Sequence, residues 1–200
     1  MQLLVATRNA HKLQEIRAIL NLPGLALSGA DEVPGLPEVD EDAPTFEGNA
    51  LKKARTLAAA SGRWTLADDS GLEVDALGGA PGVISARYAG PEASTPANNA
   101  KLLRALDGVK NRRARFRCVL ALCAPDGRTW TVEGRCEGKI LEAPRGAQGF
   151  GYDPLFVPDG YEQTFAELAG GVKNRISHRA VALQRAVAEW NSMLRDGRKG

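Results

Sequence analysis

The chain has 200 residues, of which 44% are hydrophobic and 25% are charged, with a net charge of +2. This length and apolar fraction predict a single domain over residues 1–200 with a core of its own. A charge so near balance argues against a protein that coats nucleic acid. The longest apolar run, residues 118–124, is far shorter than the roughly 20 residues of a membrane span, so we expect no membrane segment.

The numbers and spacing of the cysteines and histidines argue for free thiols and against a zinc site. Cys118, Cys123 and Cys136 are odd in number and lack CxxC spacing, which predicts free thiols and a cytoplasmic protein. The chain has only two histidines and no cluster of cysteine with histidine. A zinc site is therefore not expected.

The first part of the chain predicts strands alternating with helices. The apolar run 3–6 predicts a buried strand, and a helix follows until Pro23-Gly24. The stretch 29–44 is rich in proline and acids and predicts an irregular loop. A second helix is predicted to end at Gly62, and a strand from residue 64 is predicted to end at the pair Asp68-Asp69.

The rest of the chain predicts further mixed structure. Glycine-rich loops are expected at 78–91 and 146–151, with a helix starting at Thr95-Pro96 between them. Strands are predicted at 114–123 and 129–140, joined by a turn at residues 125–127. A last helix is predicted to begin near Ser177. This mixture predicts an α/β fold with a mixed sheet.

The loop between the first strand and helix carries residues suited to phosphate. These are Thr7, Arg8, Asn9, Ala10, His11 and Lys12. A helix N-terminus presents N–H groups and about half a positive charge, and Lys12 in the first turn adds a full cation. This combination suits a polyphosphate, and it also fits a capped helix with a solvated lysine.

Two acidic stretches suggest a divalent cation. Neighbouring strand residues alternate in direction, so one carboxylate of the pair Asp68-Asp69 can enter a site while the other points away. Mg²⁺ prefers carboxylate oxygens and binds through one or two of them together with substrate phosphates. The run Glu38 to Asp42 supplies a further carboxylate. Both stretches also fit ordinary turn and surface acids.

Two later segments combine aromatic and basic side chains. Phe150 and Tyr152 flank a glycine, which suits stacking on a nucleobase or packing in a core. The basic run 173–179 surrounds the predicted start of the last helix, where cations oppose the helix dipole. Such a conflict indicates a bound anion or an acceptor-rich ligand, and basic surface is the alternative. Together the segments supply what a nucleoside triphosphate site needs, without a P-loop.

Five segments, in chain order, resemble the inosine/xanthosine triphosphate pyrophosphatases over about Leu3 to Leu183. They are ATRNAHKLQEI, FEGNALKKA, LADDSGLEVDALGGAPGVISARYAG, GFGYDP and ISHRA. The sequence departs from the family at Arg8, where glycine is frequent. The resemblance implies an elongated mixed sheet with flanking helices, in two lobes around a central cleft that holds the site. It also implies a homodimer and Mg²⁺-dependent cleavage of ITP, dITP and XTP to the monophosphate and pyrophosphate.

The resemblance also implies a role for each matching residue. Asp69 would be the general base and a metal ligand, with Glu38 as the second metal carboxylate and Glu41 as its alternative. Residues 7–12 would hold the triphosphate, with Lys53 reaching the phosphates and Ser70 contacting substrate. The base would be enclosed and recognised by Phe150, Gly151, Tyr152, Asp153, Lys173, His178 and Arg179.

The basic side chains offer donors only, which match the 6-oxo acceptor of hypoxanthine and leave adenine unmatched. Exclusion of the 2-amino group of guanine would account for rejection of GTP. Two alternatives stay open. One is a nucleotide pyrophosphatase that prefers pyrimidines or other modified bases. The other is a module that senses nucleoside triphosphates without hydrolysing them.

Overall fold

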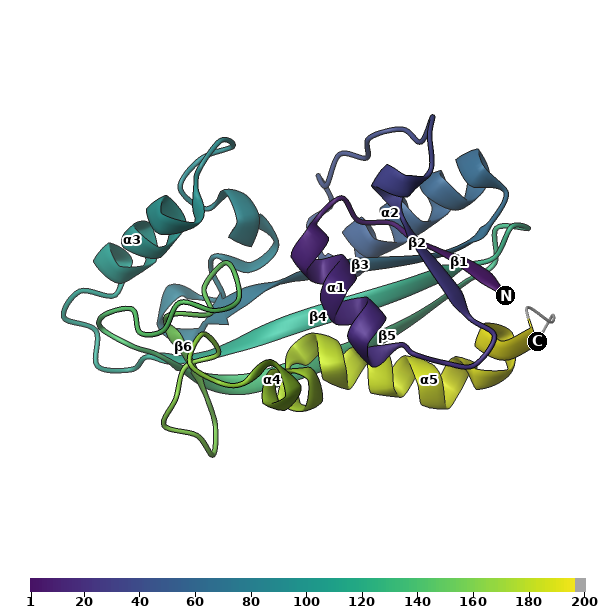
Figure 1. The fold of residues 1–200 in the computed structure, drawn as a ribbon. Coiled ribbons are helices and arrows are strands. Elements are labelled where there is room, and N and C mark those ends of the chain that lie inside the picture. Colours follow the sequence, from purple (N-terminus) through teal and green to yellow (C-terminus); the bar gives the residue numbers. More distant parts are fainter. Residues whose placement is uncertain (197–200) are drawn as a thin grey trace. The chain divides into compact units, whose positions relative to one another are not determined.

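The structure is a computed structural model that describes residues 1–196. Its six strands form one sheet in the order β2-β1-β3-β4-β5-β6 (Figure 1). The strands are β1 (Gln2–Val5), β2 (Ala26–Gly29), β3 (Trp64–Val74), β4 (Arg113–Cys123), β5 (Thr129–Ile140) and β6 (Phe156–Pro158). The α-helices are α1 (Ala10–Ile19), α2 (Phe46–Ser61), α3 (Thr95–Ala105), α4 (Gly170–Ile176) and α5 (His178–Asp196). Three short 3₁₀ helices are η1 (Ala30–Glu32), η2 (Asp75–Leu77) and η3 (Gly82–Arg87).

The sheet is mixed, as the sequence predicts. Strand β1 pairs in parallel with both β2 and β3, whereas β5 pairs with β6 antiparallel. A turn at Pro125–Gly127 joins β4 to β5, with the Gly127 N–H donating to the Ala124 carbonyl at 2.9 Å. No helix among residues 1–196 has both the length and the apolar character that a bilayer crossing requires.

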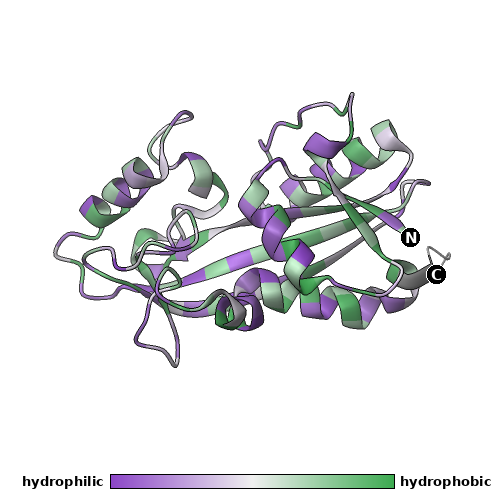
Figure 2. Cartoon of the chain, in the orientation of Figure 1, coloured by the Kyte–Doolittle hydropathy of each residue, from purple (hydrophilic) through white to green (hydrophobic). Residues whose placement is uncertain are grey.

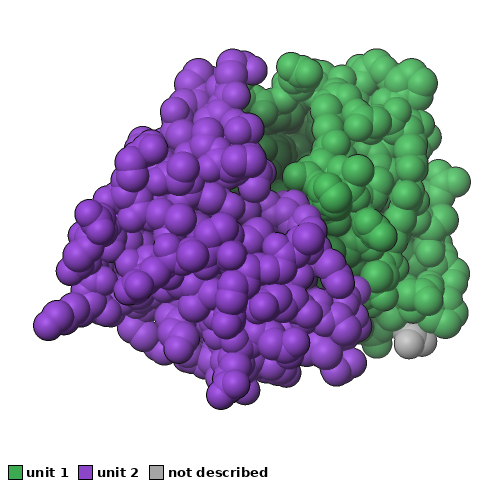
Figure 3. Space-filling view, turned by 60° about the vertical axis from the view of Figure 1, so that its left-hand side comes forward, with its two compact units in different colours: residues 1–69, 118–134, 179–200 green, residues 70–117, 135–178 purple. Residues whose placement is uncertain are grey.

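The chain divides into two compact units, coloured green and purple in Figure 3. Unit 1 comprises residues 1–69, 118–134 and 179–200, and unit 2 comprises residues 70–117 and 135–178. Strands β3, β4 and β5 contribute residues to both units.

In unit 1, strand alternation sends side chains to two helical layers. Helices α1 and α5 cover one face of the sheet and α2 covers the other (Figure 1). Leu66 of β3 and Leu120 of β4 join Ile16 and Leu183 in a buried cluster on the α1 and α5 face. Helix α5 carries hydrophobic and hydrophilic bands in turn, as an amphipathic helix should (Figure 2). The small buried residues Ala50, Ala54 and Ala58 let α2 lie close to its neighbours.

In unit 2, aromatic side chains make up much of the core. Phe116 of β4 packs against Phe156 of β6 with ring centroids 4.8 Å apart, and Phe165 lies 5.1 Å from Phe156. Leu72 and Leu102, both fully buried, belong to the same cluster. This core supports the loop that carries residues 149–153.

The predicted strands and helices are largely confirmed, including the end of α2 at Gly62, the end of β4 and both limits of β5, while β4 begins one residue earlier than predicted. Helix α3 begins at Thr95, within the predicted Thr95-Pro96 start, and Ser94 is its N-cap. Strands β2 and β6 and helix α4 are missed, and 3₁₀ helices occupy parts of the regions predicted as loops. The largest error concerns β3, which does not end at Asp68-Asp69 but continues to Val74.

Gly62 ends the helix that carries Lys53, and it has a left-handed backbone with φ +66°. We expect Gly62→Ala to lower the free energy of unfolding by about 1 kcal/mol, because a Cβ is strained in this conformation. Gly171→Ala in α4 is the matched control. A Cβ meets open space at both positions, but Gly171 has no positive φ. Urea denaturation of the two variants measures the difference, and equal effects would contradict this explanation.

Candidate active site

The two acids Asp68 and Asp69 lie in the middle of β3, beside the point where β1 ends. The last β1–β3 pair is Val5 with Leu66, and the Ala6 N–H donates to the Leu66 carbonyl at 2.7 Å. Beyond this point β3 continues without its β1 neighbour. The acids of β3 therefore lie beside the carboxyl end of the parallel strand β1. Ligands of α/β sheets usually bind at such strand ends.

Asp68 is directed to the α1 and α5 face, where its carboxylate is 0% exposed. Its Oδ1 accepts from the Lys12 ammonium at 2.6 Å, and its Oδ2 accepts from the Arg179 Nε at 2.8 Å. Arg179 Nη1 also donates to Glu15, which is three residues from Lys12 on α1. The Cys118 thiol donates to Asp68 Oδ2 at 3.1 Å. We call Lys12, Glu15, Asp68 and Arg179 the charge network.

The charge network keeps Asp68 and Lys12 ionised. Burial alone would raise the pKa of Asp68, but Arg179 and Lys12 hold that pKa well below its usual range. Burial alone would lower the pKa of Lys12, and Asp68 reverses this, so the Lys12 pKa is raised. Two positive and two negative groups balance one another in a place with little solvent, as buried charges require.

Asp69 is directed to the opposite face, toward α2. The Lys53 ammonium of α2 lies 3.4 Å from Asp69 Oδ1 and 3.0 Å from Glu41 Oε1, and it donates to the Asp68 carbonyl at 2.7 Å. Lys53 thus bridges the two carboxylates of Asp69 and Glu41. The three contacts correspond to the three donors of an ammonium group.

The environment of Asp69 favours its protonated form. Burial raises its pKa to about 6, because the attraction of Lys53 is outweighed by desolvation and by the nearby Glu41 carboxylate. The pKa of Glu41 is lowered, since Lys53 more than offsets the effect of its burial. A carboxylate with a pKa near neutrality suits a group that accepts a proton during a reaction.

The predicted phosphate loop uses several of its donors on itself. Asn9 is the N-cap of α1, and its Oδ1 accepts from the backbone N–H groups of His11 and Lys12 at 3.0 and 3.1 Å. The Thr7 Oγ1 accepts from the Asn9 N–H at 3.1 Å. A phosphate bound here would compete with Asn9 for these N–H groups. Ala10 and His11 are exposed at the start of the helix.

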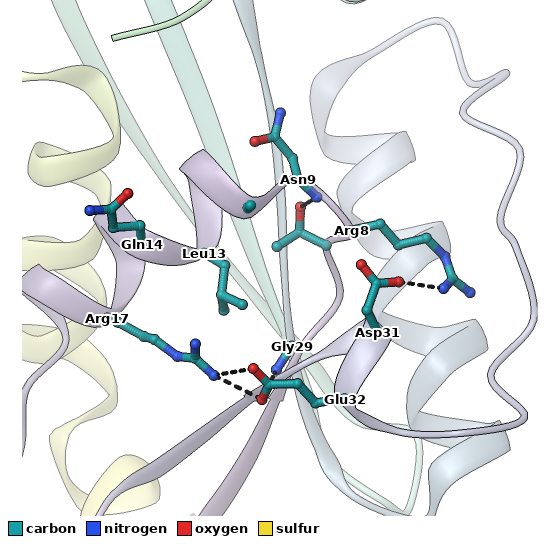
Figure 4. A pocket seen from close by; sticks show the side chains of 10 residues that line it. Arg8, Asn9, Leu13, Gln14, Arg17, Gly29, Asp31 and Glu32 are labelled. Carbon is teal, nitrogen blue, oxygen red and sulfur yellow. Dashed lines mark hydrogen bonds and ion pairs between the residues drawn. The ribbon is translucent and has the colours of Figure 1, made fainter. Parts of the chain in front are cut away.

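Arg8 belongs to a neighbouring cavity of about 380 Å³ (Figure 4). Its guanidinium donates to Asp31 at 2.7 Å and to the Leu36 carbonyl at 3.2 Å, and Arg17 pairs with Glu32 across the same cavity. All residues with positive φ among residues 1–196 are glycines, so Arg8 fits its loop without strain. The lining of this cavity contains none of the charge network and neither Asp69 nor Lys53.

A second group of predicted site residues lies in unit 2. Asp153 Oδ2 accepts from the Phe150 N–H at 2.9 Å and from the Lys173 ammonium at 2.6 Å. Lys173 Nζ also lies 4.9 Å from the centroid of the Phe150 ring. Gly149 has φ +76°, and a Cβ there would lie 2.1 Å from Asp153 Oδ2, so only glycine fits. The Asp153 carboxylate therefore holds the conformation of this loop.

Five of the seven predicted base-binding residues are buried: Tyr152, Asp153, Lys173, His178 and Arg179. Tyr152 is 4% exposed and its hydroxyl donates to the Ser85 carbonyl at 2.8 Å. His178 is 5% exposed and its ring stacks on Phe116 with centroids 4.7 Å apart. Of the two aromatic residues at 150 and 152, only Phe150 is partly exposed.

Other predicted residues lie as follows. Gly151 accepts through its carbonyl from Asn99 Nδ2 at 3.2 Å, and Ser70 is half-buried directly after Asp69. Glu38 is exposed and makes no hydrogen bond or ion pair within the described residues, whereas Glu41 reaches Lys53. Of the two acids considered, the structure therefore brings only Glu41 to Asp69.

Lys173 and Arg175 do not oppose a helix dipole, contrary to the prediction. Both lie in the last turn of α4, a separate helix whose C-terminal end favours cations. Arg179 does lie in the first turn of α5, but Asp68 and Glu15 neutralise it. The run by itself is thus no indication of a bound anion.

The donor set near Asp69 fits Mg²⁺. Asp69 Oδ2 is buried and has no hydrogen-bond partner among residues 1–196. Within the same range no group of three histidine, cysteine or acidic residues is arranged to hold a metal. Mg²⁺ needs only one or two carboxylates, because water and substrate phosphates complete its shell. A structural zinc site would need more protein ligands.

Sequence reasoning missed two members of the charge network, Glu15 and the carboxylate of Asp68. Glu15 lies in the first of the segments that carry the resemblance, but its residue type alone indicates no role there. The signal available for Asp68 was its place on a strand buried on both faces, because such a carboxylate must find cationic partners.

The high pKa of Asp69 has a consequence for stability. The ordinary value is 3.8, so the folded chain binds this proton more tightly than the unfolded chain. Stability is therefore lost as the pH rises from about 4 to about 6, and the loss persists above that range. We expect Asp69→Asn to raise the free energy of unfolding at pH 8 by about 3 kcal/mol without metal, and to have little effect at pH 4.

Urea denaturation in EDTA at the two pH values measures this effect. Asp40→Asn, at an exposed position in the same acidic loop as Glu41, is the control and should change neither value. A gain from Asp69→Asn that is the same at pH 4 and pH 8 would show that ionisation of Asp69 is not the cause.

Comparisons with known proteins agree with this architecture. Residues 3–189 match the model of the Ham1 family. A protein of Desulforamulus reducens named dITP/XTP pyrophosphatase is 52% identical over 195 residues, covering 96% of this chain and 97% of that protein. A Geobacter sulfurreducens protein of the same name is 54% identical over 184 residues, covering 91% and 92%.

Solved structures give the same result. The Ham1 protein of Staphylococcus aureus has a TM-score of 0.87 at 38% identity, covering 96% of this chain and 99% of that chain. A structure titled nucleoside-triphosphatase / dITP/XTP pyrophosphatase, from Mycobacterium abscessus, has a TM-score of 0.76 at 45% identity, covering 92% and 98%. The family match over nearly the whole length and the identity of these relatives lead to one conclusion: the chain belongs to the Ham1 family.

Proposed function

We propose that this chain is a nucleoside triphosphate pyrophosphatase that hydrolyses dITP, ITP and XTP to the nucleoside monophosphate and pyrophosphate. The names of relatives about half identical over nearly the whole chain support a pyrophosphatase reaction with dITP and XTP as substrates. The observation on this chain that carries the proposal is Asp69, a buried carboxylate with a pKa of about 6 beside Lys53 and Glu41.

Asp69 is the general base in this proposal. A water molecule attacks the α-phosphorus, the bond to the bridging oxygen breaks, and pyrophosphate leaves. Oδ2 of Asp69 has no competing hydrogen bond among residues 1–196, so it is available to accept the proton of that water. Lys53 keeps Asp69 and Glu41 together despite their like charge.

Asp69 and Glu41 would hold Mg²⁺, and Lys12 with the start of α1 would bind the triphosphate. When bound, Mg²⁺ would neutralise phosphate charge and make water more acidic. Lys12 supplies a fixed cation, and the α1 N-terminus supplies the positive end of a helix dipole. Both act where negative charge develops on the leaving pyrophosphate.

Base recognition falls to the group in unit 2 built on Asp153. The partly exposed Phe150 ring offers a stacking surface, and Lys173 offers donors to a 6-oxo acceptor. Adenine, which has an amino group at that position, would leave such donors unmatched. The three cysteines are free and buried, which supports a place in the reducing cytoplasm.

Pyrophosphate release tests the proposal. We expect the chain with Mg²⁺ to release pyrophosphate from dITP and XTP much faster than from dATP or dUTP, and to lose this activity in EDTA. Asp69→Asn should keep the fold and lose activity by about 10³-fold, because the base is gone. Binding of dITP without turnover would indicate a sensor, and preference for dUTP would indicate a pyrimidine enzyme.

The two candidate metal carboxylates can be separated by a matched pair of variants. We expect Glu41→Gln to raise the Mg²⁺ concentration for half-maximal activity by about tenfold or more, because Glu41 lies with Lys53 and Asp69. Glu38→Gln, three residues away and exposed, should leave the Mg²⁺ dependence unchanged. The reverse result would restore Glu38 as the metal ligand and remove Glu41.

A further inference from the structure

The place of Glu41 beside Asp69 depends on how the loop before α2 packs against that helix. Glu41 pairs with Lys53 of α2 at 3.0 Å. Two residues further along the loop, the Ala43 N–H donates to Oδ1 of Asn49, also on α2, at 2.9 Å. Lys53 and Asn49 are four residues apart, so they lie on the same face of the helix. The loop is thus attached to one face of α2 both at Glu41 and at Ala43.

The hydrogen bond between Ala43 and Asn49 is shielded from solvent, unlike the ion pair beside it. Asn49 is 0% exposed. Asp42 and Lys52 pair at 2.7 Å, but their side chains are 72% and 39% exposed. An ion pair in such contact with solvent does little to hold two segments together, whereas a hydrogen bond to a buried acceptor is stronger than one in water. Asn49 is therefore the firmer attachment of the loop.

Gly48 lies where the loop meets the first turn of α2. A Cβ at Gly48 would lie 2.8 Å from the Ala43 Cβ and 3.1 Å from the Thr45 Oγ1. Glycine is less favourable than alanine in a helix, and Gly48 has no positive φ that would require it. A side chain at this position would push Ala43 away from Asn49. The close approach of the loop to α2 therefore accounts for the glycine.

The contact with Ala43 also sets the orientation of the Asn49 amide. A backbone N–H needs an acceptor, so Oδ1 faces the loop and Nδ2 is turned away from it. Nδ2 is buried and has no hydrogen-bond partner among residues 1–196. An unsatisfied buried donor destabilises a fold, and asparagine is a poorer helix former than alanine. The stability of α2 alone would thus favour alanine at this position, which indicates that Asn49 serves the loop.

We propose that Asn49 is a positioning residue that holds the loop at Ala43 and so keeps the Glu41 carboxylate beside Lys53 and Asp69. This inference rests on the proposed function, in which Glu41 and Asp69 would hold Mg²⁺. Asn49 itself contacts neither the ion nor the substrate. Without it, Glu41 would depend on its ion pair with Lys53, and the backbone that carries Glu41 would move more freely.

Hydrogen exchange of the metal-free chain in EDTA, followed by NMR, tests whether Asn49 holds the loop. We expect Asn49→Ala to speed exchange of the Ala43 amide by about tenfold or more, because its acceptor is gone. Asn98→Ala is the matched control. Asn98 of α3 is also buried, and its Oδ1 accepts from the Ala89 N–H at 2.7 Å in unit 2. Its loss removes the same kind of bond and should leave exchange at Ala43 unchanged.

Binding of Mn²⁺ tests whether the attached loop positions Glu41. Mn²⁺ takes the same oxygen ligands as Mg²⁺, and electron paramagnetic resonance measures its binding without substrate or turnover. We expect Asn49→Ala to weaken Mn²⁺ binding by about fivefold, the effect of about one hydrogen bond, and Asn98→Ala to leave it unchanged. Asn49→Ala added to Glu41→Gln should cause no further weakening, because the carboxylate that Asn49 positions is already gone.

Gly48→Ala supplies a second variant, so the test survives if Asn49→Ala does not fold. Alanine favours the helix, leaves Asn49 and Glu41 in place, and pushes the loop away at Ala43. We expect faster exchange at Ala43 and Mn²⁺ binding weakened by about threefold, because a displaced loop makes a poorer hydrogen bond.

Unchanged exchange at Ala43 in both Asn49→Ala and Gly48→Ala would overturn the inference. Faster exchange with unchanged Mn²⁺ binding would also overturn it, because Asn49 would then hold the loop without positioning Glu41. So would an equal further loss from Asn49→Ala in the Glu41→Gln background. If the parent chain binds Mn²⁺ but releases no pyrophosphate from any nucleotide, the proposed function fails, and the exchange and binding data still decide the role of Asn49.

Discussion

Two adjacent carboxylates on a strand that is buried on both faces determine where unit 1 must place its basic residues. Strand geometry sends Asp68 to one face of the sheet and Asp69 to the other. A buried carboxylate is costly unless cations or hydrogen bonds compensate it. Each face must therefore supply basic residues, and they come from segments far apart in the sequence: α1 and α5 for Asp68, and α2 for Asp69.

The negative charges of Asp68 and Asp69 are compensated unequally. This difference gives the two carboxylates different pKa values and so suits them to different roles. Asp68 receives two cations and a thiol, and its pKa is held well below the usual range. Asp69 receives one lysine, which it shares with Glu41, and one of its oxygens lacks a hydrogen bond among residues 1–196. One carboxylate is thus fixed as a permanent charge and the other is left able to take a proton. Adjacent acids in different surroundings acquire different roles.

The same inequality links stability to activity. A fully compensated Asp69 would make the folded chain more stable above pH 6 but would be a poorer base. The chain carries this local destabilisation next to a well-packed core that includes Leu66 and Leu120. Proteins commonly bear such a cost at functional sites.

Local pattern was enough to predict the regular elements that have strong signals. Gly62 ends α2, and the apolar runs of β4 and β5 appear where predicted. Strand β2 has only four residues and one that is buried, so it carries no pattern to detect. Its place is set by pairing with β1.

The sequence was enough to predict which residues belong to the site, but not which of them contact one another. Asp69, Lys12 and Lys53 stand out by type and position, but their partners depend on tertiary contacts such as Arg179 with Asp68, 111 residues apart. Glu41 differs from Glu38 only in which of them reaches Lys53. Helix α4 was missed because the basic run 173–179 suggested a ligand and not a short helix.

The central claim is that the neighbouring carboxylates of β3 differ in protonation because of their partners. Carbon-13 NMR of the side-chain carboxyl carbons, followed from pH 8 to pH 4.5 in the metal-free chain, tests it directly. The account predicts that Asp69 titrates with a midpoint near 6 and that Asp68 shows no titration over this range. Two carboxyls that both begin to titrate only toward pH 4, as solvated aspartates do, would contradict it.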